Sequence, residues 1–261
     1  MLKFLRNTLF SQEVGFIEMH NVEKPVVFSR RIQAMFSAIA PRYDFLNRLL
    51  SVGFDRYWRK SAIDLLAPRS GDHILDVATG TGDMILEIIS RGLPDVRVVG
   101  VDFSRRMLEL GRRKIRPRDC NQTVSFHLGN GENLPLADMS FECATCAFGV
   151  RNYANVKLGL REMHRVLKPG GRVVILEFSV PANSILRRVY NWYFGLVLPK
   201  VGNLISGHGE AYSYLPESVM EFPDQNEFAN WVKEAGFENV VCRELTFGIV
   251  SLHYGCKGNN A

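Results

Sequence analysis

The sequence lacks the marks of a secreted protein. Lys3 and Arg6 stand among apolar residues near the start, but neither a signal-peptide core nor a small-residue cleavage site follows. The 5 cysteines show no spacing typical of a disulfide framework. We therefore expect a cytoplasmic protein, peripheral at most to the inner face of a membrane. The first ten residues form either a short amphipathic helix on that membrane or a frayed end.

The sequence also lacks a convincing metal site. Cys143 and Cys146 form a C-x-x-C pair inside an apolar run at 141–148 that predicts a buried strand. Residues three apart on a strand face opposite sides of the sheet, so the two thiols cannot share a metal ion. We expect both to pack in the core, and we expect no bound metal.

Charge of one sign is not in large excess. Lys and Arg outnumber Asp and Glu by 32 to 27, which identifies neither nucleic acid nor lipid, and we expect no nucleic-acid partner. Cations gathered at 105–118 face either solvent or anionic lipid. With 46% hydrophobic residues in 261, the chain is long enough to bury a full core as one domain with an extension.

Hydrophobic periodicity predicts an α/β fold. Strands are expected at 73–78, 97–102, 124–129, 141–147 and 172–178. Helices are expected between them at 83–91, 104–114 and 155–167, the last ending sharply at a Lys-Pro-Gly-Gly turn, 168–171. This alternation predicts a seven-stranded, mostly parallel sheet whose last hairpin inserts an antiparallel strand.

We expect a single domain at 29–257 behind an N-terminal extension at 1–28. Apolar residues at helical spacing predict a helical cap at 29–67, ahead of the sheet. The segment 180–222 is an insertion that we expect on the substrate side. Its apolar part, Ile185–Leu198, is too short to span a bilayer and forms a groove that meets the membrane, a buried helix or a dimer contact.

The run from Asp76 to Asp83 predicts a nucleoside site. It joins an apolar strand to a helix through Gly80 and Gly82, which allow the backbone angles of a tight turn and the close approach of a ligand. The next strand ends at Asp102, which can accept hydrogen bonds from both ribose hydroxyls. Open α/β sheets hold nucleosides at this carboxyl edge.

The same turn argues against a dinucleotide. Ile85 stands where the pyrophosphate-binding pattern has a third glycine, and Asp83 places negative charge at the helix start. A cationic ligand without phosphate suits the flanking Asp76 and Asp83 better. We therefore expect S-adenosylmethionine as the cofactor.

A second polar cluster follows the third predicted strand. Asn130 and Gly131 would lie at the same sheet edge as Asp102, where they could read the adenine edge while Leu134 packs on its face. Asn and Gly are also the usual residues of a plain turn. The shared edge favours the adenine site.

Several motifs give the chain a resemblance to a known family. They are Tyr43–Asn47 with Leu50, Ser51 and Trp58, then Gly80–Asp83, Phe148–Asn152, Arg165–Gly171, Leu176–Ser179, Tyr212–Ser218, Phe222–Gln225 and Ala235–Glu238. On these motifs the chain resembles the ubiquinone/menaquinone biosynthesis C-methyltransferases. These are class I, Rossmann-like enzymes that use S-adenosylmethionine to methylate a ring carbon of a polyprenylated quinol.

The resemblance implies where the cofactor binds. It transfers the family's contacts to Thr81, Asp102, Asn130 and Gly131. A further contact, usually a serine, falls on Ala147, where only the backbone can take part. In the first motif the family commonly has His where this chain has Asp55, which leaves a catalytic part for that position open.

Methylation of a ring carbon needs a neighbouring hydroxyl to lose its proton, so the site must favour a phenolate-like anion. Arg151 is always charged and forked, so it suits stabilising that anion or holding a water that takes the proton. Asn152 could orient the ring or the cofactor. Further candidates for the quinol hydroxyls are Tyr43, His208, Tyr212 and Tyr214, each of which could instead pack in the core or a loop.

We therefore expect a C-methyltransferase that converts demethylmenaquinol to menaquinol. The 2-methoxy-6-polyprenyl-1,4-benzoquinol of ubiquinone synthesis is a close alternative substrate. A methyltransferase for RNA or a small polar metabolite, and a cofactor-binding scaffold without chemistry, are the alternatives of other classes. A membrane surface and a second copy of the chain remain open as partners.

Overall fold

The computed structural model describes residues 28–115, 123–193, 195 and 209–259. Expectations for the first ten residues and for His208 fall outside these residues, as does the side chain of Tyr212. In the part described, no helix combines the length and the apolar character needed to cross a bilayer.

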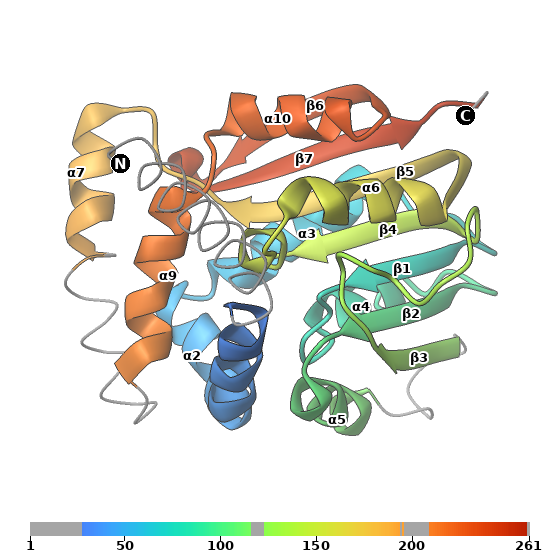
Figure 1. Cartoon of the computed structure of the whole chain (residues 1–261), viewed down its shortest axis with the longest axis horizontal. Coiled ribbons are helices and arrows are strands. Elements are labelled where there is room, and N and C mark those ends of the chain that lie inside the picture. Colours follow the sequence, from blue (N-terminus) through green and yellow to red (C-terminus); the bar gives the residue numbers. More distant parts are fainter. Residues whose placement is uncertain (1–27, 116–122, 194, 196–208, 260–261) are drawn as a thin grey trace, which may run out of the picture.

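A seven-stranded sheet with the order β3-β2-β1-β4-β5-β7-β6 forms the centre of the molecule (Figure 1). Its strands are β1 (His73–Val77), β2 (Arg97–Asp102), β3 (Thr123–Leu128), β4 (Phe141–Ala147), β5 (Leu167–Phe178), β6 (Phe237–Leu245) and β7 (Val250–Lys257). β1 to β5 pair in parallel, while β7 runs antiparallel to both β5 and β6. The predicted sheet, with its antiparallel strand in the last hairpin, is confirmed.

Helices cover both faces of the sheet. They are α3 (Phe54–Leu66), α4 (Asp83–Ile89) and α5 (Arg105–Lys114) on one side, and α6 (Val156–Val166) and α10 (Gln225–Glu234) on the other. Neighbouring residues of each strand alternate between the two resulting cores. Cys143 belongs to the first and Cys146 to the second, so the two thiols lie on opposite faces of the sheet.

The end of α6 differs from the predicted turn. β5 starts at Leu167, directly after the helix, because Leu167 already pairs with Phe141. The next pair joins Arg172 to Cys143, so residues 168–171 bulge out of the ladder instead of separating helix from strand. Gly170 takes the positive φ of 74° that this bulge requires.

The cap and the insertion lie together at one end of the sheet. The cap consists of helical residues 28–39, the short turn η1 (Ala40–Arg42), α2 (Tyr43–Leu50) and α3; the insertion contributes α7 (Ser184–Trp192) and α9 (Gly209–Glu221). Their apolar residues form a third core around Leu46, Tyr190 and Val219. Figure 1 shows α2, α7 and α9 at the end of the molecule opposite β3.

Candidate active site

Two cavities meet where the central strands end beneath the cap. One, of about 480 Å³, lies over the glycine turn; the other, of about 380 Å³, lies between the cap and the insertion. Phe36, Tyr43 and Phe148 line both cavities. Ligands in the two cavities would therefore face each other across this shared wall, and we call the two the turn cavity and the cap cavity.

Asp102 is the buried acid of the turn cavity. Its Oδ2 accepts a hydrogen bond from the Gly80 amide at 2.8 Å, and its Oδ1 accepts one from the Ser104 amide at 2.8 Å. Burial raises the pKa of this carboxyl to about 6, although both amides oppose the shift. Each oxygen keeps a lone pair, so the carboxylate can still accept bonds from a ligand's hydroxyls.

The glycine turn brings Gly80 to the turn cavity. Gly80 has a φ of +56°, and no atom lies within 4 Å of the position that a Cβ would occupy there. The described lining does not include Asp76, Thr81 or Gly82. A ligand can thus approach the main chain at Gly80. The other three predicted contacts of the turn lie outside the cavity lining.

Asp76 holds the turn in place from inside the sheet. It is buried and accepts hydrogen bonds from Thr79 Oγ1 at 2.6 Å and from Thr145 Oγ1 at 2.8 Å. Burial raises the pKa of Asp76 to about 7. The side chain thereby ties the end of β1 to β4 and to the turn.

The negative charge at the start of α4 is balanced within the protein. Asp83 forms ion pairs with Lys114 and with Arg59, the latter at 3.1 Å. Although burial alone would raise it, these cations hold the pKa of Asp83 below its ordinary value. Lys114 also pairs with Asp44 at 2.6 Å, and Asp44 accepts a bond from Thr81 Oγ1 at 2.5 Å. Through these ion pairs Asp83 connects the glycine turn to the cap, and it does not line the turn cavity.

The polar residues after β3 form one side of the turn cavity. Asn130 and Gly131 line it, as Ala147 does from the end of β4. The Asn130 side chain accepts a bond from the Glu132 amide at 3.0 Å, which fixes the turn. Leu134 is buried in the core, and its amide donates to Glu162 on α6 at 2.8 Å, so it does not lie on a ligand face.

Helical residues 28–39 close the turn cavity from the cap side. Gln33 lines the cavity and donates a hydrogen bond to the Phe103 carbonyl, directly after β2. Ser37 and Ser104 share a hydroxyl bond of 2.9 Å. The sequence motifs gave no signal for this contact, because it joins residues about seventy positions apart.

The segment after β4 has two unusual backbone features, at Phe148 and at Gly149. Phe148 has a φ of +56°, which is rare for a bulky side chain and is maintained only when the surroundings fix it. A Cβ at Gly149 would lie 2.5 Å from that of Ala78, so only glycine lets the ends of β1 and β4 approach this closely. Together they turn the chain so that the Phe148 ring stands between the two cavities.

Arg151 lies at the base of the cap cavity in a buried ion pair. Its Nη1 donates to Glu177 Oε1 at 2.6 Å and to the Phe148 carbonyl at 2.8 Å, and its guanidinium lies 5.4 Å from the Phe178 ring centroid. Glu177 is fully buried; burial raises its pKa, and Arg151 opposes that shift. Arg151 Nε has no hydrogen-bond partner among the described residues.

Phenol groups surround this arginine. Tyr214 on α9 donates to Asn152 Oδ1 at 3.1 Å, which joins the insertion to the end of β4. Burial raises the pKa of Tyr43 and of Tyr214, although Arg151 opposes the shift at each. Both phenols therefore remain protonated at neutral pH. Tyr43 can donate its O–H into the cap cavity, whereas the O–H of Tyr214 is already given to Asn152 and leaves only its oxygen as an acceptor.

Asp55 also lines the cap cavity, at the position where the resemblance leads one to expect His. It accepts bonds from Ser51 Oγ at 3.0 Å and from Arg59 Nη1 at 2.5 Å. Arg59 extends from this carboxylate to Asp83 at the glycine turn. A continuous set of charges thus links the lining of the cap cavity to the glycine turn.

Besides Gln33, sequence reasoning missed three further residues of the site. Glu177 belongs to the motif Leu176–Ser179, but no role was predicted for it. An acid inside an apolar strand was a usable signal, because a buried acid needs a cationic partner such as an arginine. Phe148 and Phe36 carry no signal, because an aromatic residue on a shared cavity wall looks like a core residue in sequence.

The chain matches a model of the "ubiE/COQ5 methyltransferase family" over residues 24–257. It is 50% identical over 228 residues to the "Ubiquinone/menaquinone biosynthesis C-methyltransferase UbiE" of Geobacter sulfurreducens, which covers 87% of this chain and 89% of the relative. It is 47% identical over 226 residues to a "Demethylmenaquinone methyltransferase" of Deinococcus radiodurans, covering 87% of this chain and 92% of the relative.

Solved structures with little sequence identity share the fold. A SAM-dependent methyltransferase from Thermotoga maritima superposes with a TM-score of 0.61 at 22% identity, covering 86% of this chain and 99% of that one. The [4+2]-cyclase SpnF superposes with a TM-score of 0.65 at 14% identity, covering 88% and 96%. The same architecture thus supports different chemistries, and the site must distinguish them.

Proposed function

The chain belongs to the ubiE/COQ5 methyltransferase family, and we propose that it methylates a ring carbon of demethylmenaquinol to give menaquinol, with S-adenosylmethionine as the methyl donor. The observation that carries the proposal is the pair of cavities with one common wall. Asp102 and exposed backbone mark the turn cavity, whereas aromatic side chains around Arg151 line the cap cavity. Direct transfer between two bound molecules requires such a junction.

The residues of the turn cavity fit S-adenosylmethionine. Asp102 offers free lone pairs to the ribose hydroxyls, the open space over Gly80 admits the ligand to the main chain, and Asn130 and Gly131 lie where an adenine edge would be read. When bound, the cofactor supplies a methyl group on a positively charged sulfur. Ala147 can contribute only backbone and apolar contact.

Residues of the cap cavity would prepare the ring for attack. Arg151 presents a fixed positive charge to a deprotonated ring hydroxyl, because Glu177 and the Phe148 carbonyl hold its guanidinium in place. A water held by Arg151 would take the hydroxyl proton. Tyr43 and Tyr214 line the cap cavity and would orient the ring, whereas Asn152 lines the turn cavity and would hold Tyr214 in place through its Oδ1.

The benzoquinol of ubiquinone synthesis is the second candidate substrate. The Geobacter relative carries the names of both quinones, and the apolar cap cavity does not discriminate a one-ring from a two-ring quinol. Because either substrate carries a prenyl tail, we also propose that the enzyme works at the cytoplasmic surface of a membrane.

One assay tests the reaction and its substrate. The protein is incubated with methyl-labelled S-adenosylmethionine and each reduced quinone precursor, and mass spectrometry locates the label. We expect label on a ring carbon of demethylmenaquinol. Arg151→Lys is the comparison variant, because it keeps the positive charge but loses the forked guanidinium. Cofactor binding by the wild-type protein without label on any quinol would favour a scaffold; label on an oxygen or on RNA would replace the proposed substrate.

A further inference from the structure

We propose that the mouth of the cap cavity is a membrane-docking surface that binds bilayers rich in anionic lipid. We call it the rim, and define it by the exposed apolar residues Val52, Phe54, Leu186, Val189, Trp192 and Phe247, all of which line that cavity. The inference rests on the proposed function in one respect: a prenyl tail must leave the cavity through this mouth.

Helix α7 presents two apolar stripes where a surface helix normally has one. Leu186, Tyr190 and Tyr193 recur at helical spacing and pack toward the third core or the cap cavity. A second stripe with the same spacing begins one residue earlier and consists of Ile185, Val189 and Trp192. Their exposed fractions are 70%, 58% and 58%. Among the described residues no hydrophobic core includes this second stripe, which is typical of a helix that lies in a membrane interface.

Other elements extend this stripe around the cavity mouth. Val52, between α2 and α3, is 78% exposed, and Phe54, the first residue of α3, is 49% exposed. Phe247, between β6 and β7, is 76% exposed. Because all three line the same cavity as Val189 and Trp192, the apolar side chains surround a single opening. A contiguous patch of this kind marks an interaction surface.

The charges around the rim favour an anionic bilayer over a protein partner. Arg187 and Arg188 on α7 and Arg56 on α3 are exposed. The acids of α2 and α3 are paired within the protein: Asp44 with Lys114, Asp55 with Arg59, and Asp64 with Lys60 and Arg91. α7 itself contains no acidic residue. Exposed cations beside apolar and aromatic side chains are the composition that anionic headgroups attract.

The size of the cap cavity requires an opening onto an apolar phase. At about 380 Å³ it is near the lower end of the range for cavities that enclose drug-sized ligands. A quinol ring fits such a space, but a long polyprenyl tail does not. With the rim seated on a bilayer, the tail would remain in lipid while the ring enters the cavity.

Vesicle sedimentation of the full-length chain, without cofactor or quinol, tests the surface. The probe is a vesicle of phosphatidylcholine with about one third phosphatidylglycerol, against phosphatidylcholine alone. We expect binding to the anionic vesicle, at least tenfold weaker for Val189→Asp and about fivefold weaker for Arg188→Gln. Val241→Asp and Arg243→Gln on β6 are the matched controls, because Val241 is 51% exposed on an edge strand and neither residue lines the cap cavity. They should bind as the wild type does.

Equal binding of Val189→Asp and Val241→Asp would overturn the proposal, as would absence of wild-type binding. Light scattering on the same samples decides a third outcome. A wild-type dimer that ignores vesicles, and that Val189→Asp converts to a monomer, would assign the rim to a second copy of the chain. Thermal melting checks that each variant is folded.

An activity assay separates this inference from the proposed function. Ile185 lies on the exposed stripe but does not line the cap cavity. We expect Ile185→Asp to methylate a soluble quinol with one prenyl unit at the wild-type rate, and a long-tailed quinol in anionic vesicles several-fold more slowly. A wild-type protein that binds vesicles but methylates neither quinol contradicts the proposed function alone. Equal losses on both quinols contradict the docking role.

Discussion

The turn cavity and the cap cavity are adjacent but are built differently. Strand ends and their backbone groups form most of the turn cavity, and Asp102 is held by two main-chain amides. The cap cavity is assembled from the cap, α7, α9 and the loop between β6 and β7, which meet through aromatic side chains. The sheet therefore fixes the first cavity, whereas the second depends on side-chain packing between separate segments.

The buried acids of the two cavities show the same contrast. Asp102 has only neutral donors, and burial raises its pKa to about 6. Glu177 is equally buried but faces Arg151 at 2.6 Å. Asp102 can thus take its charged partner from a ligand. Glu177 is already paired with Arg151 and holds that guanidinium in place for a substrate.

The largest effect should follow from Arg151→Ala. Loss of the guanidinium removes the stabilisation of a ring anion, and comparable losses of one oxyanion donor slow turnover by about 10² to 10³-fold. Arg151 lines only the cap cavity, so the dissociation constant of S-adenosylmethionine should change by less than about threefold. Steady-state kinetics and calorimetry measure the two quantities. Equal loss of binding and turnover would move Arg151 into the cofactor site.

A double variant separates chemistry from folding at this position. Arg151→Ala alone leaves Glu177 buried without its partner, which destabilises the protein by about 3–5 kcal/mol. Arg151→Met with Glu177→Gln removes that charge. We expect urea unfolding to show most of the stability restored and methyl transfer still lost. Restored transfer would mean that Arg151 acts only in folding.

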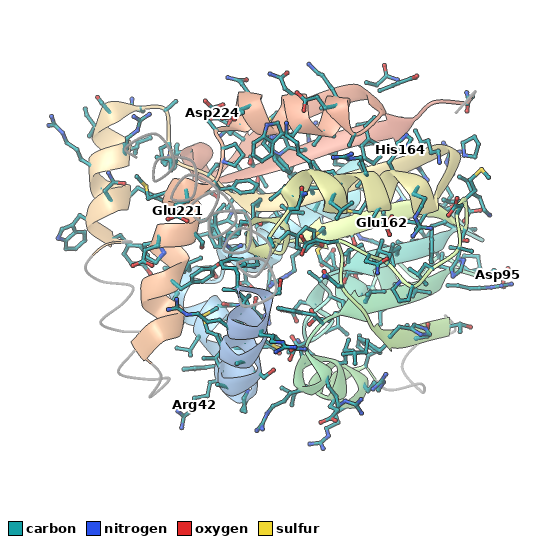
Figure 2. All side chains as sticks on the ribbon, in the orientation of Figure 1. Arg42, Asp95, Glu162, His164, Glu221 and Asp224 are labelled. Carbon is teal, nitrogen blue, oxygen red and sulfur yellow. The ribbon has the colours of Figure 1, made fainter. Side chains whose placement is uncertain are left out.

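Asp102→Asn should give the next largest effect, on the other cavity. The neutral amide loses charge-assisted hydrogen bonds to the ribose hydroxyls, and its NH₂ group opposes one of the two backbone amides. We expect a dissociation constant for S-adenosylmethionine about 10- to 100-fold higher by calorimetry. Asp95→Asn is the control, because Asp95 lies at the far end of the sheet from the cap (Figure 2). An unchanged constant for Asp102→Asn would remove the ribose assignment.

Asp76→Asn tests whether the protein interior behind the glycine turn is as strongly desolvated as the pKa of Asp76 implies. Folding raises that pKa from an ordinary 3.8 to about 7, so the native state binds the additional proton. The associated stability is complete below about pH 4 and is lost as the pH rises to 7, at up to about 1.4 kcal/mol per pH unit. Urea unfolding at pH 5 and pH 7 should show a flatter dependence for Asp76→Asn. Parallel dependences would mean that this carboxyl is ionised throughout.

The difference between the cavities also explains which parts of the fold and the site could be predicted from the sequence. Strand and turn signals are local, so the mostly parallel sheet with an antiparallel strand in its last hairpin, and the places of Gly80 and Asp102, followed from periodicity and spacing. Contacts between distant segments leave no local pattern, and the role of Gln33 and the wall made by Phe36 were not predicted. Asp83 was expected to face the ligand, because sequence could not show that Arg59 and Lys114 would meet it.

The smallest effect tests the boundary between the cavities. Phe36 lines both and makes edge-on contacts with Tyr43 and Phe103, at 6.0 and 6.4 Å between ring centroids. Loss of such contacts is worth about 0.5–1.5 kcal/mol. In Phe36→Leu we therefore expect the cofactor dissociation constant and the KM for the quinol each to rise by about threefold.

Residues confined to one cavity provide the contrast. Met107 lines only the turn cavity, so Met107→Leu should change only the cofactor constant, and Phe178→Leu in the cap cavity should change only the KM. If Phe36→Leu altered one quantity alone, the wall would belong to a single site. A ligand in one cavity would then not reach the side chain at which the two cavities adjoin, and contact between the two ligands at Phe36, which direct transfer requires, would have no support.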